Sequence, residues 1–98
     1  MLDIMRVGVI GIGGMGKRWT QVAAEHPESE VTVVCHPEKE KVEAFAEQYQ
    51  CDATTTWEGV LDREDVDAVI VATPHVYLTQ VAQAALSRGK HVFCEKPG

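Results

Sequence analysis

Four glycines follow an apolar run near the start of the chain, in the stretch Arg6-Val-Gly-Val-Ile-Gly-Ile-Gly-Gly-Met-Gly16. The spacing of Gly11, Gly13 and Gly16 is G-x-G-x-x-G, which is typical of a loop that holds the phosphates of a dinucleotide. We expect Gly11 to make a tight turn off a strand, Gly13 to leave room for a pyrophosphate and Gly16 to let the next helix pack closely.

The helix that follows the loop would offer unpaired N–H groups to the same phosphates. Groups in its first turn, near Gly14 and Met15, have no acceptor within the helix and lie at the positive end of its dipole. We therefore predict phosphate contacts from Ile12, Gly14 and Met15 as well as from the three spaced glycines. A purely structural glycine-rich turn is the alternative, but a predicted strand before the loop and a predicted helix after it favour binding.

Length and charge limit the classes of function. The 98 residues are enough for one domain, and the net charge of −6 comes without a basic cluster, which argues against a nucleic-acid partner. No apolar run approaches the ~20 residues that span a bilayer, and the start lacks a signal-peptide cleavage site, so we expect a cytoplasmic protein. No C-x-x-C or H-x-x-x-H spacing predicts a metal site.

The cysteines predict free thiols. Cys35, Cys51 and Cys94 form an odd, widely spaced set in a chain with enough apolar residues for a core. Such usage is typical of a reducing compartment. We expect all three thiols to be reduced and unpaired.

Hydrophobic periodicity predicts alternating strands and helices that position the glycine loop. The expected strands cover residues 7–12, 31–35, 53–55, 68–72 and 91–94. Four helical stripes lie between them, and their apolar members are Met15, Trp19, Val22 and Ala23; Val42, Phe45, Ala46 and Tyr49; Trp57, Val60 and Leu61; and Leu78, Val81, Ala82 and Ala85. We assign Trp19 to the core. Thr55 and Glu58 have capping-box spacing, and Gly89 is placed to end the last helix.

This alternation predicts an α/β fold of the Rossmann type, a three-layer, doubly wound parallel sheet with strand order 3-2-1-4-5. Ligands bind such sheets at the carboxyl ends of the strands, where the strand order reverses. Four polar segments follow strands at that edge, at residues 11–16, 35–36, 73–75 and 95–97. We expect them to surround one crevice.

Three motifs in order make the whole chain resemble the glucose–fructose oxidoreductase/inositol dehydrogenase (Gfo/Idh/MocA) family of NAD(P)-dependent dehydrogenases. They are the glycine loop, Ala72-Thr73-Pro74 and Gly89-Lys-His-Val-Phe-Cys-Glu-Lys-Pro97, and the last is the most specific. The resemblance implies NAD or NADP as the cofactor, with Thr73, Pro74 and His75 beside it. It also implies that Glu95 approaches the nicotinamide ribose.

The resemblance places Lys96 beside both the nicotinamide and the substrate hydroxyl, as the catalytic residue. A lysine there can orient the oxygen, stabilise its charge or relay its proton while hydride leaves the carbon. The family proline often follows a cis peptide bond, and such a bond before Pro97 would direct Lys96 into the crevice.

Three positions depart from the family pattern on the cofactor side. His36 stands where many members carry an acidic residue for the adenosine ribose, so both the preference for NAD and the repulsion of the NADP phosphate are lost. Lys39 or Lys41 would reach that phosphate, or else would lie on an exposed helix face paired with glutamates. His75 replaces a frequent asparagine and Leu78 a frequent histidine, whereas His26 and His91 are expected to be structural or surface residues.

The resemblance also implies a second domain, which supplies a substrate pocket, a further catalytic histidine and homo-oligomer contacts. We therefore expect residues 1–98 to be one NAD(P)-binding domain of an oxidoreductase that acts on a sugar-, cyclitol- or polyol-like substrate. A stand-alone nucleotide-binding or redox-sensing module is the alternative. A flavin or other nucleotide binder of similar topology is disfavoured by the Glu95-Lys96-Pro97 ending.

Overall fold

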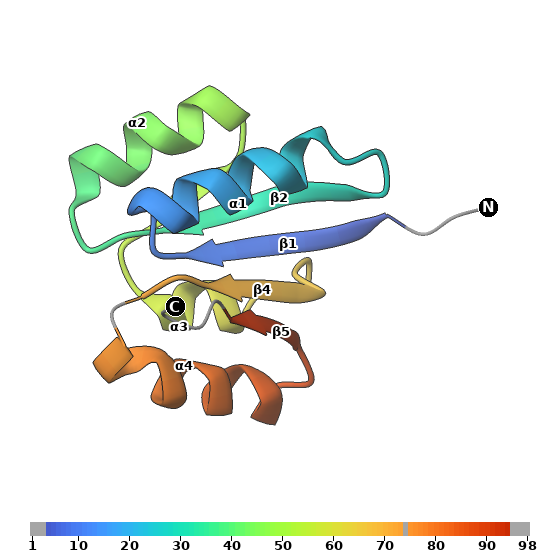
Figure 1. Ribbon diagram of the computed structural model, residues 1–98, viewed down its shortest axis with the longest axis vertical. Helices are drawn as coiled ribbons and strands as arrows, with labels where there is room; N and C mark the ends of the chain where they lie inside the picture. The colour runs from blue at the N-terminus through green and yellow to red at the C-terminus, as the bar shows by residue number, and fades with distance from the viewer. Residues whose placement is uncertain (1–3, 74, 95–98) are drawn as a thin grey trace.

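The computed structural model describes residues 4–73 and 75–94. Its strands are β1 (Met5–Ile10), β2 (Ser29–Cys35), β3 (Asp52–Thr54), β4 (Ala68–Val71) and β5 (His91–Cys94). Between them lie α1 (Gly14–Glu25), α2 (Lys39–Tyr49), α3 (Trp57–Leu61) and α4 (His75–Ser87). The strands form one parallel sheet in the order β3-β2-β1-β4-β5 (Figure 1), which confirms the predicted strand order.

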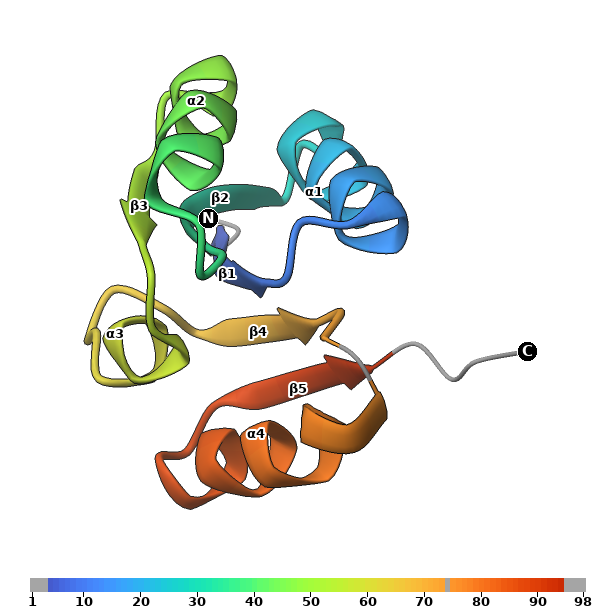
Figure 2. The ribbon, with the colours of Figure 1, turned by 90° about the vertical axis from the view of Figure 1, so that its left-hand side faces the viewer.

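Helices lie on both faces of this sheet (Figure 2), and each face has its own apolar cluster. Adjacent strand residues alternate between the clusters: Val9 joins the cluster of α2, while Ile10 joins the cluster of α3 and α4. Because β1 is buried on both faces, its apolar residues are continuous rather than alternating, as in other parallel sheets. No helix in the described part of the chain is long and apolar enough to cross a membrane.

A close approach between α3 and β1 adds detail that periodicity does not predict. A side-chain carbon on Gly8 would lie 2.5 Å from Cγ1 of Val60, so a glycine in the central strand makes room for α3. The pairing of β1 with β2 shifts at the same level, where Val7 faces Val31 and Gly8 faces Val33. Thr32 is therefore the extra residue of a bulge.

An ion pair between Arg6 and Asp67 links the amino ends of β1 and β4. Asp67 precedes β4 and accepts hydrogen bonds from the Arg6 backbone N–H at 2.9 Å, from Nε at 3.1 Å and from Nη2 at 3.0 Å. These bonds hold the pKa of the Asp67 carboxyl below its ordinary value. The pair lies at the amino ends of β1 and β4, away from the glycine loop.

Of two predicted helix ends, one differs from the structure and one agrees with it. The cap of α3 is Thr56, whose Oγ1 accepts from the Gly59 N–H at 3.3 Å, so the expected capping box of Thr55 and Glu58 is wrong by one residue. Gly89 does end α4, with φ of +74° and its N–H donating to the Leu86 carbonyl at 3.0 Å. The helix end was therefore predicted correctly.

The stripe predicted for α1 is also only partly right. The residues that α1 buries are Gly16, Thr20 and Ala23, whereas Met15 and Val22 are exposed. Thr20 is buried because its hydroxyl donates to the Gly16 carbonyl at 2.6 Å, which satisfies the polar group within the helix. Trp19 is half-buried and not part of either core cluster, so its assignment to the core is wrong.

Candidate functional site at the carboxyl edge of the sheet

Backbone hydrogen bonds tie the ends of neighbouring strands to one another. The Gly11 N–H donates to the Cys35 carbonyl at 2.9 Å, and the Ala72 N–H donates to the Ile10 carbonyl at 2.8 Å. On the far side of β2, the His36 N–H donates to the Thr54 carbonyl at 3.2 Å. The segments that follow β2, β1 and β4 therefore lie together, and the predicted glycine loop, His36 and Thr73 meet at one edge.

The three spaced glycines have separate roles in this edge. Gly11 has φ of +96°, and a side-chain carbon on it would lie 2.6 Å from the Ala72 carbonyl oxygen. A side-chain carbon on Gly16 would overlap the Gly11 carbonyl, so α1 packs directly on the turn. Gly13 has φ of −69°, and a side-chain carbon there would meet no described atom within 4 Å. Of the three spaced glycines, Gly13 alone has open space beside its backbone, and the neighbouring Gly14 has open space as well.

That open space adjoins the start of α1. Gly13 is the N-cap of the helix, no side chain caps it, and the first turn contains no acidic residue. The N–H groups of Gly14, Met15 and Gly16 have no acceptor within the helix, because an α-helix leaves its first N–H groups unpaired. A phosphate is the kind of group that satisfies such donors at the positive end of a helix.

Two basic residues follow the loop and were not singled out from the sequence. Lys17 and Arg18 lie in the first turns of α1, and both are exposed. Their charge is unfavourable to the helix dipole and favourable to a bound anion. Adjacent basic residues just after the loop, in a chain of net charge −6, were the available signal.

Thr73 brings an unsatisfied polar atom to the same edge. Its Oγ1 is buried and has no hydrogen-bond partner among the described residues. A buried hydroxyl without a partner is unfavourable, and at a ligand-binding edge it is a candidate for a contact with a bound group. The open N–H groups at Gly13 and this hydroxyl both fit a dinucleotide.

Cys35 and His36 form the end of β2. Burial raises the pKa of the Cys35 thiol to about 11, and the Glu58 carboxylate adds to the effect, so the thiol stays protonated. His36 is half-buried, and its Nδ1 accepts the Glu38 N–H at 3.0 Å. Neither residue supplies a carboxylate at this strand end.

The structure describes only some of the other predicted site residues. His75 begins α4, which places its backbone next to Thr73 at the same edge. Pro74, Glu95 and Lys96, together with Pro97, lie outside the described residues. Leu78, at the position of a frequent family histidine, packs against the core cluster of α3 and α4. No group of metal-binding side chains occurs within residues 4–73 and 75–94.

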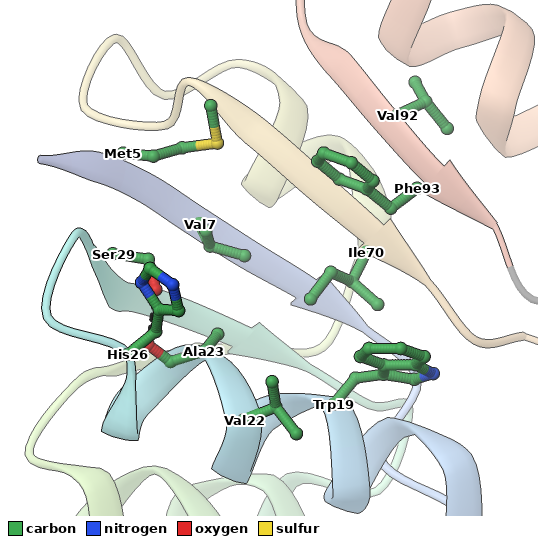
Figure 3. A pocket seen from close by; sticks show the side chains of 10 residues that line it. All are labelled: Met5, Val7, Trp19, Val22, Ala23, His26, Ser29, Ile70, Val92 and Phe93. Atoms are coloured by element: carbon green, nitrogen blue, oxygen red, sulfur yellow. Dashed lines mark hydrogen bonds between the residues drawn. The ribbon is translucent and has the colours of Figure 1, made fainter.

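An apolar hollow lies elsewhere, on the face of the sheet beside α1 (Figure 3). This apolar hollow has a volume of about 690 Å³, and its lining includes Trp19 and Val22 of α1, Ile70 of β4 and Phe93 of β5. Phe93 and Val22 are exposed, because no described helix covers the β4 and β5 half of this face. Val22 of α1 is exposed because it borders this hollow. The hollow is not part of the carboxyl edge.

Comparison with known proteins shows the family to which this chain belongs. The family model described as "Oxidoreductase family, NAD-binding Rossmann fold" matches residues 5–98. The chain belongs to the Gfo/Idh/MocA family. The Gfo/Idh/MocA match includes the glycine loop, the turn after β4 and the end of the chain, so the resemblance drawn from the motifs is confirmed.

Several characterised relatives are similar over almost the whole chain. A dTDP-3,4-didehydro-2,6-dideoxy-alpha-D-glucose 3-reductase of Streptomyces antibioticus is 36% identical over 94 residues, which are 95% of this chain and 29% of the relative. A 2,7-anhydro-N-acetylneuraminate hydratase of Mediterraneibacter gnavus is 35% identical over 89 residues, which are 91% of this chain and 23% of the relative. The chain spans less than a third of either Gfo/Idh/MocA relative.

Solved structures agree. KijD10, a 3-ketoreductase from Actinomadura kijaniata crystallised with NADP and TDP-benzene, superposes with a TM-score of 0.91 at 33% identity. The superposition covers 97% of this chain and 30% of that protein. The chain is therefore an NAD(P)-binding Rossmann domain of the Gfo/Idh/MocA family, as the motifs predicted.

Proposed function

We propose that this chain is the cofactor-binding part of an enzyme that transfers hydride between NAD(P) and a sugar-, cyclitol- or polyol-like substrate. The observation that carries the proposal is the open space at Gly13 beside the unpaired N–H groups of α1. The space lies at the switch point between β1 and β4, where doubly wound sheets bind dinucleotides.

The cofactor would be held mainly by backbone at residues 11–16. His36 would lie toward the adenosine ribose, and the turn at residues 73–75 would contact the cofactor at the end of β4. Glu95 would approach the nicotinamide ribose, as the family resemblance implies. When bound, the nicotinamide supplies the hydride acceptor or donor.

Lys96 is the residue that we assign to proton handling. In the sequence it follows the last residue of β5 by two positions, and the carboxyl end of β5 lies at the same edge of the parallel sheet as the carboxyl ends of β1 and β4. An ammonium group beside a substrate hydroxyl orients that oxygen, stabilises negative charge on it and relays its proton. Pro97, directly after it, restricts the backbone at this point.

The substrate site would come from a further part of the polypeptide. The relatives are more than three times as long as the matched region, and two are named for reactions of sugar derivatives. We propose that a second domain binds the hydroxylated substrate and forms homo-oligomer contacts, in a cytoplasmic enzyme without a nucleic-acid or membrane partner.

Calorimetric titration of NADH and NADPH into the purified chain tests this function. We expect saturable one-site binding of at least one of the two dinucleotides and no comparable heat with nicotinamide alone. The absence of binding by both dinucleotides would overturn the proposal.

A further inference from the structure

The end of β2 offers a hydrogen-bond donor where an NAD site usually offers an acceptor. A carboxylate at this position takes the two ribose hydroxyls of NAD, and positive or donor groups accommodate the 2′-phosphate of NADP. Here the strand ends with the buried Cys35 thiol and is followed by the half-buried His36. The position therefore lacks both the acceptor pair and the negative charge that would repel a phosphate.

The hydrogen bond at His36 determines which ring nitrogen carries the proton. Nδ1 accepts the Glu38 N–H at 3.0 Å, so its lone pair is occupied and the proton of the neutral ring is at Nε2. Nε2 makes no hydrogen bond to any described residue. The ring thus presents an N–H donor, and phosphate oxygens only accept.

The charged residues near the His36 ring do not replace the carboxylate that an NAD site would have at this strand end. The Glu38 carboxylate is paired with Lys41 at 3.0 Å, and Lys39 begins α2 as an exposed residue. Glu40, also exposed, and Glu58, which acts on the Cys35 thiol, are the opposing charges. The two lysines balance Glu38 and Glu40 at the start of α2, so that among these groups only the Glu58 carboxylate, which acts on the buried Cys35 thiol, is left unbalanced.

We propose that His36 is a specificity residue that makes this domain bind NADP(H) in preference to NAD(H), by donating from Nε2 to the 2′-phosphate. This inference rests on the proposed function, because it assigns the adenosine end of the same dinucleotide site. A charge-assisted hydrogen bond of this kind corresponds to roughly a 10- to 100-fold difference in affinity.

The chain contains a matched control for this residue. The tripeptide His26-Pro27-Glu28 repeats His36-Pro37-Glu38, and the Glu28 N–H donates to Nδ1 of His26 at 3.1 Å. His26 follows α1 and precedes β2, so it lies at the amino edge of the sheet, while His36 lies at the carboxyl edge. The same substitution at both histidines changes the net charge equally but only one lies at the site.

The experiment is the calorimetric titration of NADPH and NADH into the wild-type chain and the variants His36→Asp, His36→Gln and His26→Asp. We expect the wild type to bind NADPH at least 10-fold more tightly than NADH. In His36→Asp the affinity for NADPH should fall at least 10-fold while that for NADH holds or rises. His36→Gln keeps an N–H donor and should retain part of the preference, and His26→Asp should match the wild type within about twofold.

The possible failures can be told apart. Equal affinities in the wild type, or a ratio that His36→Asp leaves unchanged, would overturn the role of His36 while the proposed function stands. An equal loss of NADPH binding in His26→Asp would assign the effect to overall charge and would also overturn it. Binding of neither dinucleotide by the wild type would overturn the proposed function and this inference together. Circular dichroism of each variant confirms that it is folded.

Discussion

Helix α1 packs so closely on the turn before it that a side-chain carbon on Gly16 would overlap the backbone carbonyl of Gly11. Gly11 itself lies against the residue that follows β4, because a side-chain carbon on Gly11 would be too close to the Ala72 carbonyl oxygen. These two glycines are therefore required by the fold. Gly13, between them, borders open space, so folding and binding can be separated by mutation within one loop.

Replacement of Gly13 by valine should abolish dinucleotide binding and leave the domain folded. Its φ of −69° suits any residue and no atom lies within 4 Å of the added carbon, so the loss of stability should be about 1 kcal/mol, from a poorer N-cap. Calorimetry with NADPH and urea unfolding measure the two effects. If Gly13→Val bound as tightly as the wild type, the phosphate-binding role of the loop would be wrong.

Gly11→Ala should destabilise the domain by at least about 2 kcal/mol, because it combines positive φ with overlap of the Ala72 carbonyl. Gly89→Ala is the matched control, since Gly89 has φ of +74° but open space around it. That variant should lose only about 1 kcal/mol. Urea unfolding of the two variants checks the difference, and equal losses would show that close packing at Gly11 contributes nothing.

The chain alone should bind cofactor without measurable turnover. Correct orientation of a substrate against the nicotinamide is worth roughly 7–11 kcal/mol of the barrier, and we assign that task to a further domain. Lys96→Ala should keep most of the affinity for NADPH, because the lysine acts on the substrate oxygen. Titration of that variant and a dehydrogenase assay against a polyol panel test both points; oxidation of a polyol by the chain alone would contradict them.

The thiols of Cys35 and Cys51 should react slowly in the folded protein. Burial raises the pKa of each to about 11, and both are free. At pH 8 the thiolate fraction is then roughly two orders of magnitude below that of an ordinary cysteine. In the variant Cys94→Ser, Cys35 and Cys51 are the remaining thiols, so their reaction can be followed alone.

Timed reaction with a thiol reagent should be slow in buffer and complete in denaturant. For the unmodified chain, unfolding without a reductant should release three thiols, because β2 and β5 are three strand positions apart, roughly 14 Å. Recovery of one thiol from monomeric protein would contradict this arrangement.

The pair of Arg6 and Asp67 should make the domain sensitive to acid. Hydrogen bonds from Arg6 lower the pKa of Asp67 in the folded state, so the carboxylate stabilises the fold above its unfolded pKa, near 4, and this contribution is lost as pH falls below that value. Asp67→Asn should flatten the fall of the unfolding free energy between about pH 4 and pH 2. It should not alter NADPH binding, since the pair lies at the opposite edge. An unchanged acid slope would assign the sensitivity to other carboxylates.

The sequence by itself determined the fold class and predicted where the candidate site lies. Continuous apolar runs at β1 and β4 and helical stripes between strands identified a parallel sheet, and the expected strand order put its switch point at the carboxyl ends of β1 and β4. The glycine spacing predicted a phosphate-binding loop there. These features are local, because each depends on residues within one turn or one strand.

Only the tertiary structure decided which apolar residues are buried and which atoms lie beside each glycine. The stripe of α1 predicted Val22 in the core, but the half of the sheet over which it would pack has no described helix beside it, so Val22 is exposed. The glycine spacing assigns Gly11 to a turn and Gly13 to a space for a pyrophosphate, but only the structure shows that the Ala72 carbonyl, just after β4, leaves no room for a side chain on Gly11. Such differences arise from contacts between segments distant in the chain, and local periodicity carries no record of them.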